Sequence, residues 1–151
     1  MRQSSPNFEK LKAHILLRSQ ATNFHTASKE WVVTNIELSD VPSHCPCGQL
    51  IMEHCHIANC VTGNETVVGN VCVNHFMGVD LSAVFVGVKR VKKNISKSPN
   101  QALINYAVQH KLINEWEENF LTSTMHKRSL SDKQLACRDK INKRILVAVT
   151  R

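Results

Sequence analysis

Apolar and polar residues follow two rhythms along the chain, one typical of strands between residues 30 and 73 and one typical of helices elsewhere. A helix is predicted over residues 5–18, because a serine and a proline suited to a first turn precede apolar residues at helical spacing. These apolar residues are Phe8, Leu11 and Ile15. The β-branched segment EWVVTNIEL, residues 30–38, predicts a strand that ends at the turn-forming sequence SDVPS.

A β-hairpin is predicted after this strand. LIMEHCHIA, residues 50–58, predicts the first strand of the hairpin, and TVVGNVCV, residues 66–73, predicts the returning strand after a turn at 62–64. Side chains on the first strand alternate between two faces, so that one face carries Ile51, Cys55 and Ile57 and the other carries His54 and His56. The isoleucines favour the first face as the one that meets the core.

Helices are predicted throughout the remaining part of the chain. Asp80 can cap the first helix of this region, and the segment SKSPN breaks the pattern after it. Two further helices are expected at about residues 99–110 and 113–125, and the last helix begins at the capping box Ser131–Gln134. The expected core anchors of these helices are Leu81, Val84, Phe85, Val88, Leu103, Tyr106, Ala107, Trp116, Phe120, Leu121, Ile141, Ile145 and Val149.

The predicted fold class is therefore α+β. Five cysteines lie in or beside the hairpin, at positions 45, 47, 55, 60 and 72. We therefore expect a small zinc-bound β-hairpin, of the zinc-ribbon or treble-clef type, with an N-terminal helix and a C-terminal helical bundle. Residues 1–80 would form the helix, strand and zinc-binding hairpin, and residues 81–151 the basic helical region. The two parts are expected to form one compact unit.

Charge is distributed unevenly between these two parts. Residues 1–80 carry five Lys/Arg and seven Asp/Glu, a net charge of −2, whereas residues 81–151 carry fourteen and five, a net charge of +9. Such asymmetry is typical of a surface for nucleic acid, although a solvated helix face that maintains solubility explains it about equally well. The expected nucleic-acid-binding residues are Lys89, Arg90, Lys92, Lys93, Lys140, Lys143 and Arg144.

Soft metal ligands are concentrated in the segment 44–76, which holds five of the six cysteines and four of the eight histidines. The N-terminus has charges on both sides of a short apolar run and does not resemble a signal peptide, so we expect a reducing compartment, where clustered cysteines favour metal over disulfides. The sequence Cys45-Pro-Cys47-Gly48 predicts a tight metal-binding turn, and Zn²⁺ requires four N or S donors.

The predicted zinc ligands are Cys45, Cys47, Cys72 and, as the favoured fourth, Cys55. The alternative fourth ligand is His75, because Cys72-Val-Asn-His75 forms a C-x-x-H pair of the kind found at the start of a helix in treble-clef zinc sites. Cys60 and Cys137 are expected to be ordinary thiols.

The CPCG sequence and the segment IANCVTGNETVVGNVC, residues 57–72, together resemble a zinc-binding segment of small bacteriophage and prophage proteins. The terminal LSDKQLACRDKIN, residues 130–142, resembles helices of phage proteins as well. The resemblance covers about a third of the chain and is not tied to a named family. It implies a zinc site, a phage origin and a location in the cytoplasm of a bacterial host cell.

A binding function is expected rather than an enzymatic one. The order His54, His56, Asn64 or Asn70, then His75 loosely resembles an HNH-type metal nuclease, but the tandem Asp-His or His-His pair of that class is missing. The favoured function is a zinc-stabilised, non-enzymatic protein that contacts nucleic acid. The alternative is an inhibitor or modulator that docks on a host complex, such as RNA polymerase or a CRISPR-type defence nuclease. No apolar run is long enough to suggest a membrane span.

Overall fold

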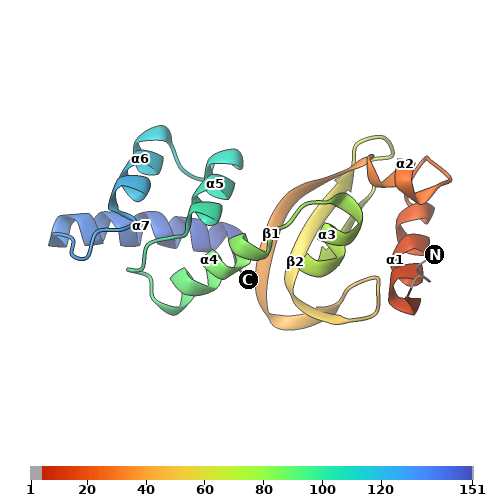
Figure 1. Cartoon of the computed structure of the whole chain (residues 1–151), viewed down its shortest axis with the longest axis horizontal. Coiled ribbons are helices and arrows are strands. Elements are labelled where there is room, and N and C mark those ends of the chain that lie inside the picture. The colour runs from red at the N-terminus through yellow and green to blue at the C-terminus, as the bar shows by residue number, and fades with distance from the viewer. Residues whose placement is uncertain (1–4, 151) are drawn as a thin grey trace. The chain divides into compact units, whose positions relative to one another are not determined.

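The computed structural model describes residues 5–150. The chain forms two compact units, Met1–Asp80 and Leu81–Arg151, coloured along the sequence in Figure 1. Within the described residues, the fold is α+β, with a three-stranded antiparallel sheet in the first unit and seven helices, of which three belong to the first unit and four to the second.

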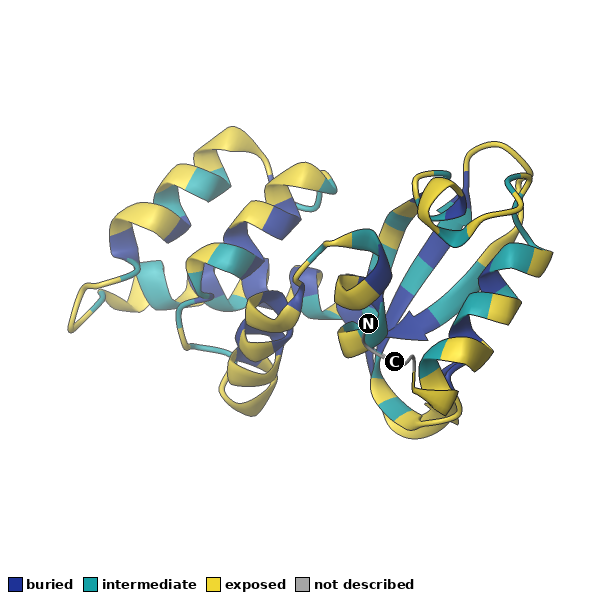
Figure 2. Cartoon of the chain, turned by 45° about the vertical axis from the view of Figure 1, so that its right-hand side comes forward, coloured by how far each residue is buried: buried dark blue, intermediate teal, exposed yellow. Residues whose placement is uncertain are grey.

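The sheet of the first unit has the strand order β1-β2-β3, with β1 at Trp31–His44, β2 at Leu50–Asn59 and β3 at Glu65–Gly69. Its register places Ile36, Cys55 and Val68 side by side across the three strands. All three side chains are buried, and they form the inner face that the alternation of the sequence predicts. Figure 2 shows the buried stretches along these strands in dark blue.

Strand β1 is longer than the sequence pattern predicts. The expected turn at SDVPS is wrong, because the chain remains extended as far as His44. The pairing with β2 shifts register between Leu38 and Ser43, so the segment bulges instead of reversing. Ser39 supports this bulge, since its hydroxyl accepts from the backbone N–H of Val41 at 3.1 Å and donates to the carbonyl of the same residue at 3.0 Å.

The N-terminal helix α1, Pro6–Leu17, confirms the prediction, with Pro6 in its first turn. The hydroxyl of Ser5 caps it by accepting from the backbone N–H of Phe8 at 3.1 Å. Its residues Leu11 and Ile15 are buried. Ring contacts continue from Phe8 to Phe24 of the short helix α2, Phe24–Ser28, at 5.3 Å between centroids.

The predicted returning strand is wrong in its second half, because β3 ends at Gly69 and helix α3 occupies Asn70–Met77. Cys72 therefore lies on a helix. The buried residues Val73 and Phe76 are three apart, which is the spacing of one helix face. The helix ends at Gly78, whose φ of +67° is the left-handed conformation that favours glycine at this position.

The second unit consists of α4 at Ser82–Lys93, α5 at Gln101–Gln109, α6 at Glu115–Thr124 and α7 at Asp132–Val149. Figure 2 shows the buried sides of these helices turned toward one another. The capping box of α7 is confirmed, with Ser131 and Gln134 bonded to each other's backbone.

Two expectations for these helices are wrong. The N-cap of α4 is Leu81, without a side-chain cap, and not Asp80. Trp116 is 63% exposed and stacks on Phe120 at 5.5 Å, so it is not a core anchor. The apolar stripe of α6 is narrower than expected, and Leu121 is its fully buried member.

Two polar side chains of α7 organise the core of the second unit. The buried amide of Asn142 donates to the carbonyl oxygens of Ile95 and Lys97 at 2.7 and 2.8 Å. The guanidinium of Arg138 donates to the carbonyl oxygens of Ser96 and Thr124 at 3.2 and 2.8 Å. The carbonyls of Ile95, Ser96 and Lys97 lie in a loop, and that of Thr124 lies at the end of α6. Both side chains therefore satisfy backbone groups that helix packing alone would leave unpaired.

A first prediction concerns the close approach of α4 and α5 at Gly87. A Cβ at this position would lie 2.2 Å from Oδ1 of Asn100, the atom that caps α5 by accepting from the backbone N–H of Leu103. Gly87→Ala should therefore lower the free energy of unfolding by about 1–3 kcal/mol, although alanine is the better helix former. Urea denaturation measures the change. The control is Val86→Ala at a neighbouring exposed position of the same helix, and equal stability of the two variants would contradict the prediction.

Candidate metal centre

Three cysteines of the first unit meet at one point. The Sγ atoms of Cys45, Cys47 and Cys72 all lie within 4.8 Å of one another. The first two belong to the turn between β1 and β2, and the third lies in the first turn of α3, which packs on β2 and β3 as Figure 1 shows. Three thiols at this spacing can hold a metal ion.

The turn that carries the first two cysteines is shaped by backbone hydrogen bonds. The N–H of Cys45 donates to the carbonyl of Gln49 at 2.8 Å, and the N–H of Gly48 donates to the carbonyl of Cys45 at 2.8 Å. Gly48 has a φ of +100°, which is strained for residues with a side chain. The glycine of the CPCG sequence therefore lets the chain reverse while both thiols remain on the same side.

Hydrogen bonds favour an anionic sulfur at Cys45. The thiol of Cys72 donates a hydrogen bond to this sulfur, and the backbone N–H of Gly69 donates another at 3.4 Å. Together with hydrogen bonds from Cys47, they lower the pKa of Cys45 to about 5, although burial alone would raise it. The pKa of Cys72 is raised because this thiol keeps its proton to donate a hydrogen bond to the sulfur of Cys45. Cysteine binds metals as a thiolate, so the geometry already prepares one ligand in its binding form.

The two candidates for the fourth ligand are Cys55 and His75. Neither places a ligand atom within 4.8 Å of all three Sγ atoms of the cluster. Cys55 is fully buried on β2, where Ile36 and Val68 flank it, and burial raises its pKa to about 12. His75 is exposed and lies three residues after Cys72, which places the two on the same side of α3. The ring of His75 rests against Phe8 of α1, with 4.7 Å between centroids.

A cavity of about 240 Å³ lies directly beside the thiols. It is lined by Cys47, Cys72 and His75 and, from α1, by Phe8 and Leu11. His75 thus shares an open space with two of the three cysteines, whereas Cys55 does not line this cavity.

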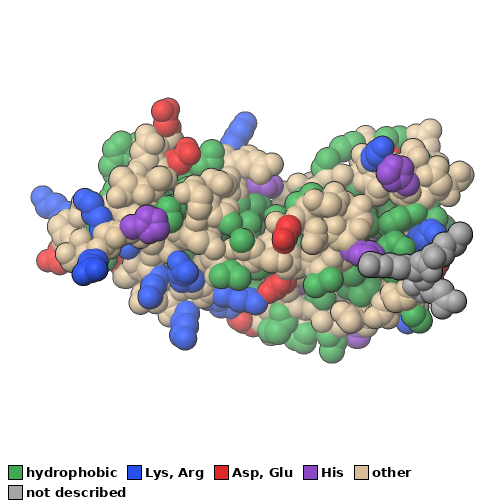
Figure 3. All heavy atoms as spheres, in the orientation of Figure 1, with side chains coloured by type: hydrophobic (Ala, Val, Ile, Leu, Met, Phe, Trp, Pro, Cys, Tyr) green, Lys and Arg blue, Asp and Glu red, His purple; other side chains and the backbone are tan. Residues whose placement is uncertain are grey.

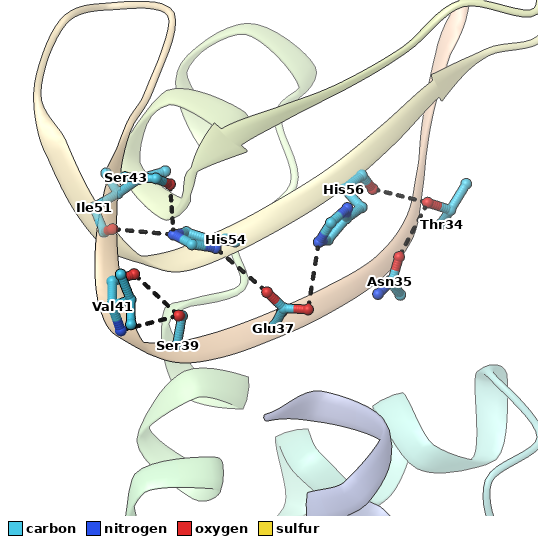
Figure 4. A network of polar contacts seen from close by, with 9 residues as sticks. All are labelled: Thr34, Asn35, Glu37, Ser39, Val41, Ser43, Ile51, His54 and His56. Atoms are coloured by element: carbon cyan, nitrogen blue, oxygen red, sulfur yellow. Dashed lines mark hydrogen bonds and ion pairs between the residues drawn. The ribbon is translucent and has the colours of Figure 1, made fainter. Parts of the chain in front are cut away.

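His54 and His56 lie on the opposite face of the sheet, where they flank Glu37 of β1, as Figure 4 shows. Nδ1 of His54 is 3.6 Å from Oε1 of the carboxylate, and Nε2 of His56 is 3.9 Å from Oε2. His54 also contacts the carbonyl of Ile51 and the hydroxyl of Ser43, each at 3.0 Å. The structure therefore does not bring these histidines to the cysteine cluster.

The predicted nucleic-acid-binding residues fall on two helices of the second unit. All four on α4 are exposed near its C-terminal end, and Lys140 and Lys143 are exposed on α7. Arg144 is different, because its guanidinium donates to the carbonyl of Leu112 and pairs with Glu117, so it braces α7 against the start of α6. Figure 3 shows Lys and Arg side chains gathered along α4 and at the start of α7.

The chain matches no family model, no curated protein and no solved structure. Within the described part of the chain, there is no helix with the length and apolar character needed to cross a membrane.

A second prediction follows from the cluster of three thiols. Cys45→Ser and Cys72→Ser should each reduce the bound metal from about one ion per chain to a small fraction of that, because either change removes a soft ligand. Elemental analysis of the purified protein measures the metal content. Cys60→Ser and Cys137→Ser are matched controls outside the cluster and should retain the ion. Metal loss in the controls but not in the cluster variants would contradict the assignment.

Proposed function

We propose that the first unit binds a structural Zn²⁺ in a treble-clef arrangement, with Cys45, Cys47, Cys72 and His75 as ligands. The order of elements supports this: a cysteine turn, then the β2–β3 hairpin, then a helix that carries Cys72 and His75 on one side. Thiolate and imidazole donors are the set that Zn²⁺ prefers in closed tetrahedral sites, while Mg²⁺ and Ca²⁺ prefer oxygen.

The role of such an ion is to join α3 to the sheet. Helix α3 has eight residues and buries Val73 and Phe76, which is a small apolar area for a helix at the edge of a core. A metal that links the helix to the turn between β1 and β2 would add folding free energy that this packing does not supply. We assign the site to stability and not to catalysis.

A third prediction separates the two fourth ligands. His75→Ala should lose zinc, whereas Cys55→Ala should keep it and lose stability only through the small cavity that the substitution leaves. X-ray absorption at the zinc edge of the wild-type protein should show three sulfurs at about 2.3 Å and one nitrogen at about 2.0 Å. Four sulfurs, together with zinc loss in Cys55→Ala, would reject His75 in favour of Cys55.

We further propose that the second unit contacts the phosphates of nucleic acid, so that the whole protein is a zinc-stabilised, non-enzymatic nucleic-acid-binding protein. The observation that supports this most is the net charge of +9 in residues 81–151 against −2 in residues 1–80. Neighbouring cations Lys89, Arg90, Lys92 and Lys93 are all exposed on α4. A cluster of exposed cations attracts the phosphates of nucleic acid, which supports an anionic partner for this surface.

A fourth prediction tests this function by its salt dependence. Wild-type protein should bind labelled DNA or RNA with an affinity that falls steeply as salt increases, because each phosphate contact releases counterions. Lys92→Gln/Lys93→Gln should lower the slope of log K against log salt by about one unit per lost contact, for all sequences alike. Lys10→Gln/Lys29→Gln removes the same charge from the first unit and should change the slope little. No binding by the wild type at low salt would reject the function.

Docking on a host protein complex is the second candidate, and one observation favours it. Val41, Leu50 and Met52 are exposed apolar side chains around the same end of the β1–β2 pair. Exposed apolar clusters commonly mark protein interfaces. A pull-down from bacterial lysate that survives nuclease treatment and high salt, and that Leu50→Ser/Met52→Ser abolishes, would support this candidate over nucleic acid.

A further inference from the structure

A groove of about 670 Å³ lies within the second unit. Its walls come from the end of α4, the loop 94–98, the connection 125–130 and the start of α7. Five cationic side chains line it: Arg90, Lys97, Lys127, Arg128 and Arg138. No carboxylate is found among the described residues that line it. Segments separated by about thirty residues in the sequence thus place their positive charges around one hollow.

Arg138 fixes the shape of this groove. It is only 6% exposed, and its guanidinium bridges two walls by donating to the carbonyl of Ser96 at 3.2 Å and to that of Thr124 at 2.8 Å. Its Nε, also buried, has no hydrogen-bond partner within the described part of the chain. The neighbouring Asp139 accepts from the hydroxyl of Ser96 at 2.8 Å, so this carboxylate is used to hold the loop. The walls are therefore held by the fold itself and do not need a ligand to form.

The remaining lining suits more than a simple anion. The hydroxyl of Ser129 adds a hydrogen-bonding group, while Met125, Leu130 and Leu135 add an apolar area. The hydroxyls of Ser96 and Ser98 also line the groove, but they already donate to Asp139 and to the carbonyl of Pro99. Cations and hydroxyls recognise phosphate oxygens, and an apolar area accommodates a sugar or a base. The volume lies in the range of sites for organic ligands of nucleotide size.

We propose that this groove binds the sugar–phosphate backbone of the nucleic acid. The inference rests on the proposed function and locates it. Three of its cations, Lys97, Lys127 and Arg128, are exposed residues outside the set that the sequence pattern indicates. Arg90 lines the groove and Lys92 and Lys93 follow it in the last turn of α4, so these lysines adjoin the groove, whereas the exposed lysines of α7 do not line it and contribute less to binding.

The test compares two triple variants of the full-length protein in titrations of labelled single-stranded and duplex DNA and RNA at several salt concentrations. The groove variant is Lys97→Gln/Lys127→Gln/Arg128→Gln, and the control is Lys133→Gln/Lys140→Gln/Lys143→Gln, with the same change in charge. At low salt the groove variant should lose at least about tenfold in affinity and about two units of salt slope, while the control should stay within about threefold of wild type. The charge-retaining variant Lys97→Arg/Lys127→Arg/Arg128→Lys should bind like wild type, and equal urea midpoints show that the fold is intact.

Three results would overturn the proposal, and they differ in what they leave standing. If the wild type binds nucleic acid and the two triple variants are equally weakened, binding depends on total charge and the groove is rejected, while the function stands. If only the control is weakened, the contact surface is α7. If the wild type binds no nucleic acid but binds poly-glutamate through the groove, both proposals fail and the groove belongs to an acidic protein partner.

Discussion

The first unit is organised around the contact of Cys72 with Cys45 and Cys47. At this contact the short helix α3 meets the turn between β1 and β2. Each partner reaches this point for a local reason. Gly48 reverses the chain, and Gly69 ends β3 in an extended conformation and directs its N–H to the sulfur of Cys45. A metal bound there would cross-link a helix that its own buried side chains hold only weakly.

The second unit also has a small core, and buried side-chain hydrogen bonds and a close helix contact stabilise it. Asn142 and Arg138 bind the carbonyl groups of the loop after α4 and of the end of α6, and Gly87 lets α5 approach α4 closely. A few buried hydrogen bonds from α7 thus hold the connections between the four helices in place. The arrangement also leaves positive charges around a groove of fixed shape, so stability and the proposed binding site share Arg138.

The sequence predicts much of this fold, and the elements that it predicts wrongly, such as the second half of the returning strand, have physical explanations. Caps and periodic stripes predicted α1 and α7, because both elements are specified by residues close together in the chain. The segment 66–73 satisfies a strand pattern and a helix pattern equally, and the spacing of Val73 and Phe76 was the available signal for the helix. The sequence left the fourth ligand between Cys55, favoured by strand alternation, and His75, and the helix at Asn70–Met77 is the reason why we propose His75. The groove was not predictable, since its cations come from separate segments that only tertiary contacts bring together.

Hydrogen exchange of the full-length protein, with and without a zinc chelator, tests most directly whether a metal at the three thiols holds the first unit together. Removal of the ion should abolish the protection of backbone amides in α3 and in the ends of β1 and β2 near the cysteine turn, because these segments then open locally. Amides of α4–α7 should keep their protection, which serves as the internal control. Unchanged protection throughout residues 31–77 after complete loss of zinc would contradict the account, since apolar packing alone would then hold α3 in place.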